Sequence, residues 1–195
     1  MDKTLLQGLI AAHLFMENGD LARAKRVLVT LPPEYYDDPR QLLVLARVVC
    51  LEVQESEDFA EAITIFRQLA RSRPRDVSIL VNVAALVLKI GYRDEKHAAR
   101  ERVADHRLAL EAARQAITVE PELPVSYLIA ARLIINLTLY ESGGAELESL
   151  EAEAKAHLDQ AETVGADPAS VATLRVALML VLGQLDAARE FLTDT

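Results

Sequence analysis

The chain has 195 residues, of which 51% are hydrophobic and 26% charged, a balance that suits a packed core and excludes a disordered chain. Its single cysteine, Cys50, excludes an intrachain disulfide, and a net charge of −9 without a basic-aromatic patch disfavours nucleic-acid binding. No apolar run reaches the ~18 residues of a membrane span and the N-terminus lacks signal-peptide features, so we expect a cytoplasmic protein with no membrane segment.

Glycine and proline positions divide the chain into helical hairpins. Glycines fall where a first helix would turn into a second, and prolines fall between hairpins, because proline cannot continue a helix. We therefore predict five hairpins, about ten helices and no convincing strand. The hairpins pair 3–18 with 21–31, 41–54 with 58–71, 77–90 with the helix that carries Ala109, 125–140 with 145–163, and 169–182 with 185–193.

The second helix of each hairpin repeats one pattern, in which small or apolar residues lie at i, i+4 and i+7 and a proline follows. The instances are Ala24/Leu28/Leu31 before Pro32, Ala62/Phe66/Leu69 before Pro74, Ala109/Ala113/Ala116 before Pro121, Ala154/Leu158/Ala161 before Pro168, and Ala188/Leu192 near the end. The stretch GDLARAKRVL at 19–28 also matches GQLDAAREFL at 183–192, which indicates an internal repeat.

This pattern resembles the second half of a tetratricopeptide repeat. The resemblance implies an all-α fold, a right-handed α-solenoid of about five helix-turn-helix hairpins forming one domain over residues 1–195. Successive signature alanines lie 38, 47, 45 and 34 residues apart, so the middle hairpins carry extra residues. The extra segments, 92–107 and 141–153, are polar and helix-prone, and we interpret them as lengthened helices or helical loops.

The first helices, in contrast, are apolar almost all round, as in VSILVNVAALVLKI at 77–90. In a tetratricopeptide solenoid the first helices line a concave groove, so the resemblance implies a mostly apolar trough. Projected groove positions are Leu6, Leu9, His13, Met16, Arg47, Leu51, Gln54, Val81, Ala85, Leu88, Leu128, Arg132 and Ile135. A trough of this kind left open to water would expose an unusually large apolar patch, which predicts that a partner segment fills it. The alternative is that the hairpins curl tightly enough to close the trough as ordinary core.

The groove does not resemble a carboxylate clamp, because no lysine accompanies Arg47, Asn82 and Arg132. Its apolar character is more similar to that of cytoplasmic chaperones of bacterial secretion systems, which use this fold to shield apolar segments. Residues 121–195 carry four basic and twelve acidic side chains, a face that serves solubility or attracts a basic partner.

Isolated reactive residues have simpler interpretations. Cys50 lies at a position where paired helices touch, which favours a buried structural thiol over a nucleophile. His97, Glu101 and Asp105 follow an i, i+4, i+8 spacing, but the many neighbouring charges favour a solvated face over a metal site. Because no catalytic, cofactor or metal motif occurs, we predict a non-enzyme without cofactors.

The sequence therefore predicts an adaptor or chaperone-type module that binds an apolar or amphipathic protein segment. One alternative is a self-associating scaffold, such as a homodimer, because no polar capping helix follows the last hairpin. A charge placed near Leu182 or Phe191 would then disrupt assembly. Another alternative is a regulatory domain of a larger protein.

Overall fold

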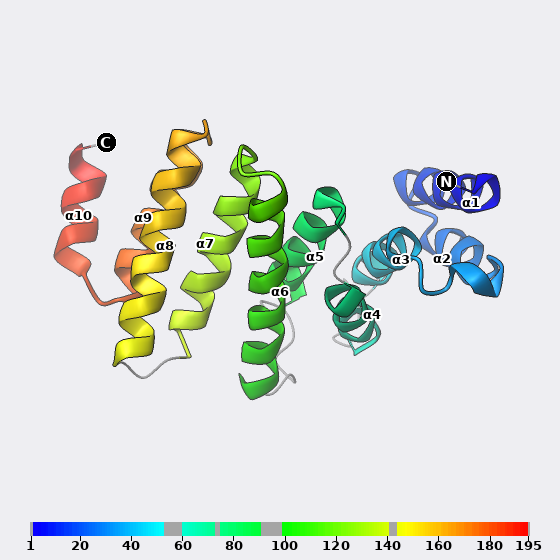
Figure 1. Ribbon diagram of the computed structural model, residues 1–195, viewed down its shortest axis with the longest axis horizontal. Helices are drawn as coiled ribbons and strands as arrows, with labels where there is room; N and C mark the ends of the chain where they lie inside the picture. The colour runs from blue at the N-terminus through cyan, green and yellow to red at the C-terminus, as the bar shows by residue number, and fades with distance from the viewer. Residues whose placement is uncertain (1, 53–59, 73–74, 91–98, 141–143, 195) are drawn as a thin grey trace. The chain divides into compact units, whose positions relative to one another are not determined.

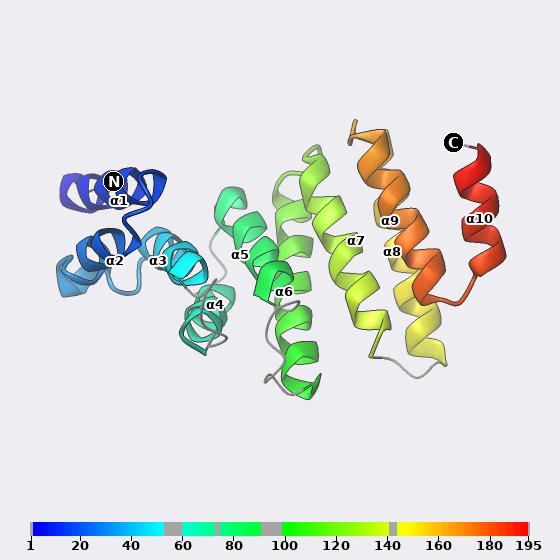
Figure 2. The ribbon, with the colours of Figure 1, turned by 180° about the vertical axis from the view of Figure 1, so that it is seen from behind.

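The computed structural model describes residues 2–52, 60–72, 75–90, 99–140 and 144–194, which form helices and no strand (Figures 1 and 2). The elements are α1 (Lys3–Glu17), α2 (Leu21–Val29), the short 3-10 helix η1 (Pro33–Tyr35), α3 (Pro39–Glu52), α4 (Ala60–Ser72), α5 (Val77–Ile90), α6 (Ala99–Val119), α7 (Pro124–Thr138), α8 (Ala145–Thr163), α9 (Pro168–Val181) and α10 (Leu185–Asp194).

The chain divides into two compact units, an N-terminal unit over Met1–Lys96 with α1 to α5 and a C-terminal unit over His97–Thr195 with α6 to α10. The single domain expected over residues 1–195 stays a prediction. Among the described helices, none combines the length and apolarity needed to cross a bilayer.

Capping residues explain why the helices begin where they do. Asp2 accepts a hydrogen bond from the Thr4 amide at 2.7 Å at the start of α1, and Asp167 accepts one from the Ser170 amide at 2.9 Å at the start of α9. Each carboxylate satisfies an amide that has no partner within the helix. Helices α3, α7 and α9 begin at prolines, where the missing amide hydrogen is no loss.

The repeated turn found in the sequence has one conformation at both of its sites. Gly19 and Gly183 have φ of 75° and 73°, a region that glycine enters without steric cost. After α1, the Asp20 amide donates to the Phe15 carbonyl at 2.9 Å, and after α9 the Gln184 amide donates to Met179 at the same distance. Both are Schellman turns, so the sequence match reflects a shared way of ending the first helix.

The signature alanines of the second helices lie where helices pack against each other. Ala24, Ala62, Ala109, Ala154 and Ala188 are all buried, because only a small side chain lets two helices approach closely. In the N-terminal unit, Leu28 and Leu31 of this pattern join Leu5, Ala12, Ala24 and Val48 in a core cluster. Gly8 of α1 serves the same purpose, since a carbon added there would lie 2.6 Å from Cδ2 of Leu31.

Helix α7 is the centre of the C-terminal unit. It packs against α6, α8 and α9, and even its polar residues Ser126, Asn136 and Thr138 are buried. The second helices α6 and α8 lie on the side of this unit that faces the viewer in Figure 1, and the first helices α7 and α9 face the viewer in Figure 2. Of the two extra segments, residues 99–107 belong to α6 and residues 145–153 to α8, whereas residues 92–98 and 141–143 lie outside the described residues.

Candidate interaction surfaces

The first helices of the N-terminal unit, α1, α3 and α5, pack in succession, α1 on α3 and α3 on α5. Each buries one side in the unit, as Leu5 does in α1, Val48 in α3 and Val83 in α5. Most residues projected onto the groove lie on the other sides of these helices, whereas Leu9 and Met16 lie toward the core, and none of those described in this unit is fully buried. We call the surface formed by these sides of α1, α3 and α5 the first-helix face. It includes Leu6, His13, Arg47, Leu51, Val81, Ala85 and Leu88.

The structure places the projected groove residues in three environments. Leu6, His13, Arg47 and Leu51 are exposed, Val81, Ala85 and Leu88 are half-buried, and Leu9 and Met16 are half-buried against the core of the first hairpin. Gln54 lies outside the described residues.

Two apolar residues of α1 belong to the first-helix face although the projection missed them. Ile10 and Leu14 are 51% and 54% exposed, and with Leu6 at 37% they form a stripe at i, i+4 and i+8. Residues at that spacing lie one above another on a helix. The spacing was visible in the sequence, but an apolar helix contains several such stripes and gives no reason to prefer one.

In the C-terminal unit, α7 presents less of its surface. Leu128 and Arg132 are half-buried, and Ile135 is only 3% exposed. At Ile135 the side chain belongs to the core between α7 and its neighbours, an arrangement that agrees with the alternative of a closed trough in this unit.

The isolated candidates that the structure describes lie in different environments. Cys50 is half-buried on α3. Glu101 is exposed whereas Asp105 is buried, and His97 lies outside the described residues. Among the residues that the structure describes, no group of three or more histidine, cysteine or acidic side chains could hold a metal ion.

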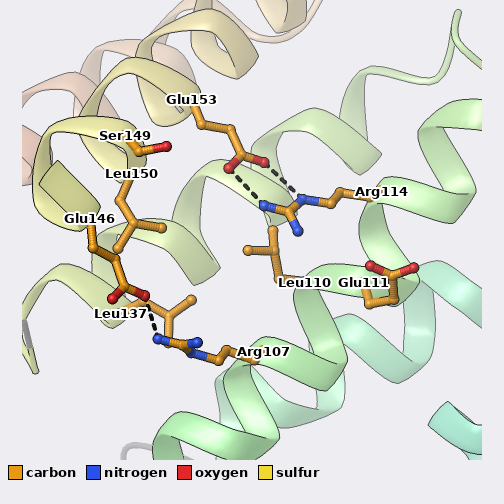
Figure 3. A pocket seen from close by; sticks show the side chains of 9 residues that line it. All are labelled: Arg107, Leu110, Glu111, Arg114, Leu137, Glu146, Ser149, Leu150 and Glu153. Atoms are coloured by element: carbon orange, nitrogen blue, oxygen red, sulfur yellow. Dashed lines mark hydrogen bonds and ion pairs between the residues drawn. The ribbon is translucent and has the colours of Figure 1, made fainter.

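A cleft lies between the second helices α6 and α8 in the C-terminal unit, and sequence reasoning did not predict it (Figure 3). We call it the α6–α8 cleft. Its volume is about 390 Å³, and it combines leucines with charged side chains. The lining residues are Arg107, Leu110, Glu111 and Arg114 of α6, Leu137 of α7, and Glu146, Ser149, Leu150 and Glu153 of α8.

Two ion pairs bridge the cleft from α6 to α8. Arg107 pairs with Glu146, and Arg114 binds Glu153 through two parallel hydrogen bonds of 2.8 and 2.7 Å (Figure 3). The arginines are seven residues apart and so are the glutamates, which places the two pairs on one side of both helices. The matched spacing is visible in the sequence, but it indicates a cleft only once the packing of α6 and α8 on α7 is known.

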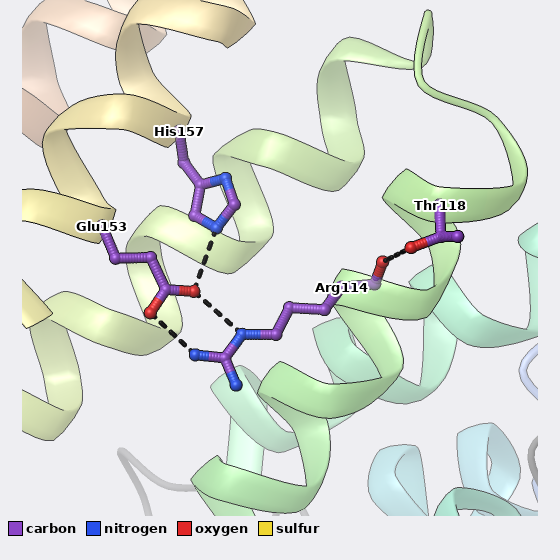
Figure 4. Close-up of polar contacts among 4 residues, drawn as sticks. All are labelled: Arg114, Thr118, Glu153 and His157. Carbon is purple, nitrogen blue, oxygen red and sulfur yellow. Dashed lines mark hydrogen bonds and ion pairs between the residues drawn. The ribbon is translucent and has the colours of Figure 1, made fainter.

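The pair formed by Arg114 and Glu153 extends to a histidine (Figure 4). Nε2 of His157 lies 3.3 Å from Oε1 of Glu153, and the His157 ring lies 5.9 Å from the ring of Tyr127 on α7. Burial by itself would raise the pKa of the Glu153 carboxyl, but the contacts with Arg114 and His157 outweigh burial and lower it. Thr118, one turn beyond Arg114, donates to the Arg114 carbonyl at 3.0 Å.

A second histidine, His106 of α6, is buried against α7. Its Nδ1 lies 2.8 Å from the Arg102 carbonyl oxygen, and its Nε2 lies 3.3 Å from Nδ2 of Asn136. A neutral ring with its proton on Nδ1 satisfies both contacts, donating to the carbonyl and accepting from the amide. Burial lowers the pKa of this imidazole, although the neighbouring Asp105 partly opposes that shift.

We expect the C-terminal unit to lose stability on mild acidification. The pKa values of His106 and His157 are both lowered, chiefly by burial, from an ordinary value of 6.5. As the pH falls, the imidazole rings of the unfolded chain therefore bind protons before those of the folded chain. The stabilisation of the folded state by these two neutral rings is complete above pH 6.5 and declines as the pH falls below it. Unfolding free energies measured from about pH 8 to about pH 5 should show this decline.

The variant His106→Gln should flatten the decline, because glutamine does not titrate. If His106→Gln kept the full acid sensitivity, this histidine would not be its source.

Comparison with known proteins identifies the fold of this chain through similar solved structures. No family model matches the sequence, and no curated protein matches it. Among solved structures, "MamA 41-end from Desulfovibrio magneticus RS-1" has a TM-score of 0.65 at 14% identity, over 100% of this chain and 94% of that one. The structure "MamA RS-1 ArsTM double mutant" has a TM-score of 0.63 at 14% identity, over 99% and 93% of the two chains. TTC0263, a thermophilic TPR protein in Thermus thermophilus, has a TM-score of 0.57 at 18% identity, over 97% and 88%. The prediction of an all-α, tetratricopeptide-like repeat fold is thereby confirmed.

Proposed function

We propose that this protein is a non-enzymatic interaction scaffold that binds an apolar or amphipathic segment of a partner protein on its first-helix face. The observation that carries the proposal is the exposed stripe Leu6, Ile10 and Leu14 on α1. Three large apolar side chains in line on one helix form the surface on which an amphipathic helix of a partner can lay its own apolar side. The partly exposed Leu51 on α3 adds apolar surface on the next first helix.

The neighbouring polar side chains suit this role. His13 pairs with Glu17 at 3.3 Å beside the stripe on α1, and Arg47 is exposed on α3. Polar groups at the edge of an apolar surface fix the register of a bound segment, while the apolar centre supplies the affinity. A cytoplasmic adaptor or chaperone-type module is the role that we propose for such a surface.

Site-specific photo-crosslinking tests the proposal. A photoreactive amino acid placed at Ile10 or at Leu51 should capture the same partner chain in cells. The same group placed at Arg26, exposed on the second helix α2, should not capture it. Capture of one species from all three positions, or of none from Ile10 and Leu51, would contradict a specific first-helix surface.

The second candidate function is a self-associating scaffold. It is favoured by the last helix, α10, where Leu185 and Leu192 are exposed seven residues apart, and by Leu180 of α9, which is half exposed. Light scattering over a dilution series measures the mass of the purified chain directly. If this candidate is correct, the mass should exceed that of one chain and should fall to it in Leu192→Lys, whereas a monomer at every concentration excludes it.

A further inference from the structure

We propose that the α6–α8 cleft is a second binding surface, which takes a basic segment of another protein anchored by one large apolar side chain. The cleft belongs to the C-terminal unit and the first-helix face to the N-terminal unit. This inference therefore stands apart from the proposed function, and either can fail without the other.

The interior of the cleft fits an apolar anchor. Leu110, Leu137 and Leu150 come from three different helices to line it (Figure 3). A volume of about 390 Å³ lies at the lower end of the range of small-ligand pockets, and it is ample for a leucine or an aromatic side chain. Anchors of this kind, seated between charged rims, supply most of the energy of many protein interfaces.

The charges around the cleft favour a cationic segment. Its lining holds three carboxylates, Glu111, Glu146 and Glu153, and two guanidinium groups, for a net charge of −1. Helix α8, which forms one wall, carries six acidic residues and one lysine. The whole C-terminal unit has 8 basic and 16 acidic residues, a net charge of −8, whereas the N-terminal unit has 13 and 14, a net charge of −1. Such a field attracts basic segments and repels acidic ones.

The ion pair between Arg107 and Glu146 leaves room for a partner to compete. Both side chains of the pair between Arg107 and Glu146 are more than half exposed. Exposed pairs contribute little to stability, so a lysine or arginine of the partner can share the glutamate without weakening the fold. The pairs are one heptad apart, or about 10 Å along the helix, a distance that a short peptide segment spans.

A peptide with one tryptophan flanked by lysines and alanine spacers tests the proposal. This protein contains no tryptophan, so selectively excited emission reports only on the peptide. When the 195-residue chain is added to the peptide, the tryptophan emission should shift to shorter wavelength as the indole enters the cleft, and the affinity should fall with added salt. A peptide with glutamates in place of the lysines should not bind.

Two variants locate the binding site. Ser149→Phe fills the cleft from the exposed side of α8, and Glu111→Lys reverses a rim charge on α6. Each should weaken binding of the lysine peptide at least roughly tenfold. The matched controls Ala169→Phe on α9 and Glu190→Lys on α10 change exposed residues outside the cleft and should bind like the parent. Circular dichroism confirms that all four variants keep their helices.

Three results would overturn the proposal. These are no spectral shift with the parent protein, equal binding of the lysine and glutamate peptides, and unchanged affinity in both cleft variants. Loss of affinity in Glu190→Lys as large as in Glu111→Lys would show attraction by net charge alone, which also excludes a defined site.

Discussion

Replacement of Phe66 by alanine should lower the free energy of unfolding of the N-terminal unit by about 3–5 kcal/mol. Phe66 is 1% exposed on α4, between the buried Ala62 and Leu69 of the same repeat pattern. Truncating it removes the whole of a buried ring and leaves a cavity that the neighbouring helices α3 and α5 can close only in part. Denaturant unfolding followed by circular dichroism measures the loss, and hydrogen exchange assigns it to α3, α4 and α5.

Gln68→Ala is the matched control for this prediction. Gln68 lies on the same helix, is exposed, and donates to Asp37 at 2.6 Å. Its loss should change the unfolding free energy by less than about 1 kcal/mol, the size of one ordinary hydrogen bond. If Phe66→Ala had no larger effect than Gln68→Ala, the repeat pattern would not mark a tightly packed core.

A glutamate introduced at two projected groove positions should lower the free energy of unfolding by very different amounts. Ile135→Glu should destabilise the C-terminal unit by about 4 kcal/mol or more, because it buries a carboxylate at a position that is 3% exposed. Leu51→Glu should change stability by only about 0.5 kcal/mol, because Leu51 is 38% exposed and water can reach the new group.

Unfolding curves and hydrogen exchange of both variants decide the matter. A stable Ile135→Glu protein would mean that α7 turns this side to water, so that the C-terminal unit would expose an apolar first-helix surface of its own. An unfolded Leu51→Glu protein would mean that α3 buries the position, which would remove Leu51 from the proposed binding surface.

The hairpins could be predicted closely because their signals are local. Helix α5 occupies Val77–Ile90, the range expected from its apolar run, and the other helices for which a range was predicted begin and end within a few residues of it. Glycine with positive φ, aspartate caps and proline at the first helical position act within one turn of the chain. The residues responsible can be identified in the sequence, because their effect does not depend on the packing of distant segments.

The face that each first helix turns to water could not be predicted in the same way. One residue corresponds to about 100° around a helix, so a small error in projecting a repeat pattern moves a position from surface to core. This explains why Leu9 and Met16 of α1 pack on the core while Ile10 and Leu14 are exposed. In α7 the problem is greater, because a helix with apolar residues on every side gives no orientation by itself.

The α6–α8 cleft escaped prediction for a different reason. Its residues come from segments that looked like charged, solvated helix, and each ion pair joins positions 39 residues apart in sequence. Only the packing of α6 and α8 on a common α7 shows that Arg107 and Glu146 are neighbours. Long-range pairs of this kind carry no local signature.

The extra turns of α6 and α8 also suggest how repeat proteins diversify. Arg107 and all the α8 residues that line the cleft lie in the two segments, 92–107 and 141–153, by which these hairpins exceed their neighbours. The signature alanines Ala109 and Ala154 follow these segments and pack as Ala24 and Ala188 do in the shorter hairpins. A repeat can thus gain a new surface by growing ahead of its packing motif, while the contact made by the signature alanine stays the same.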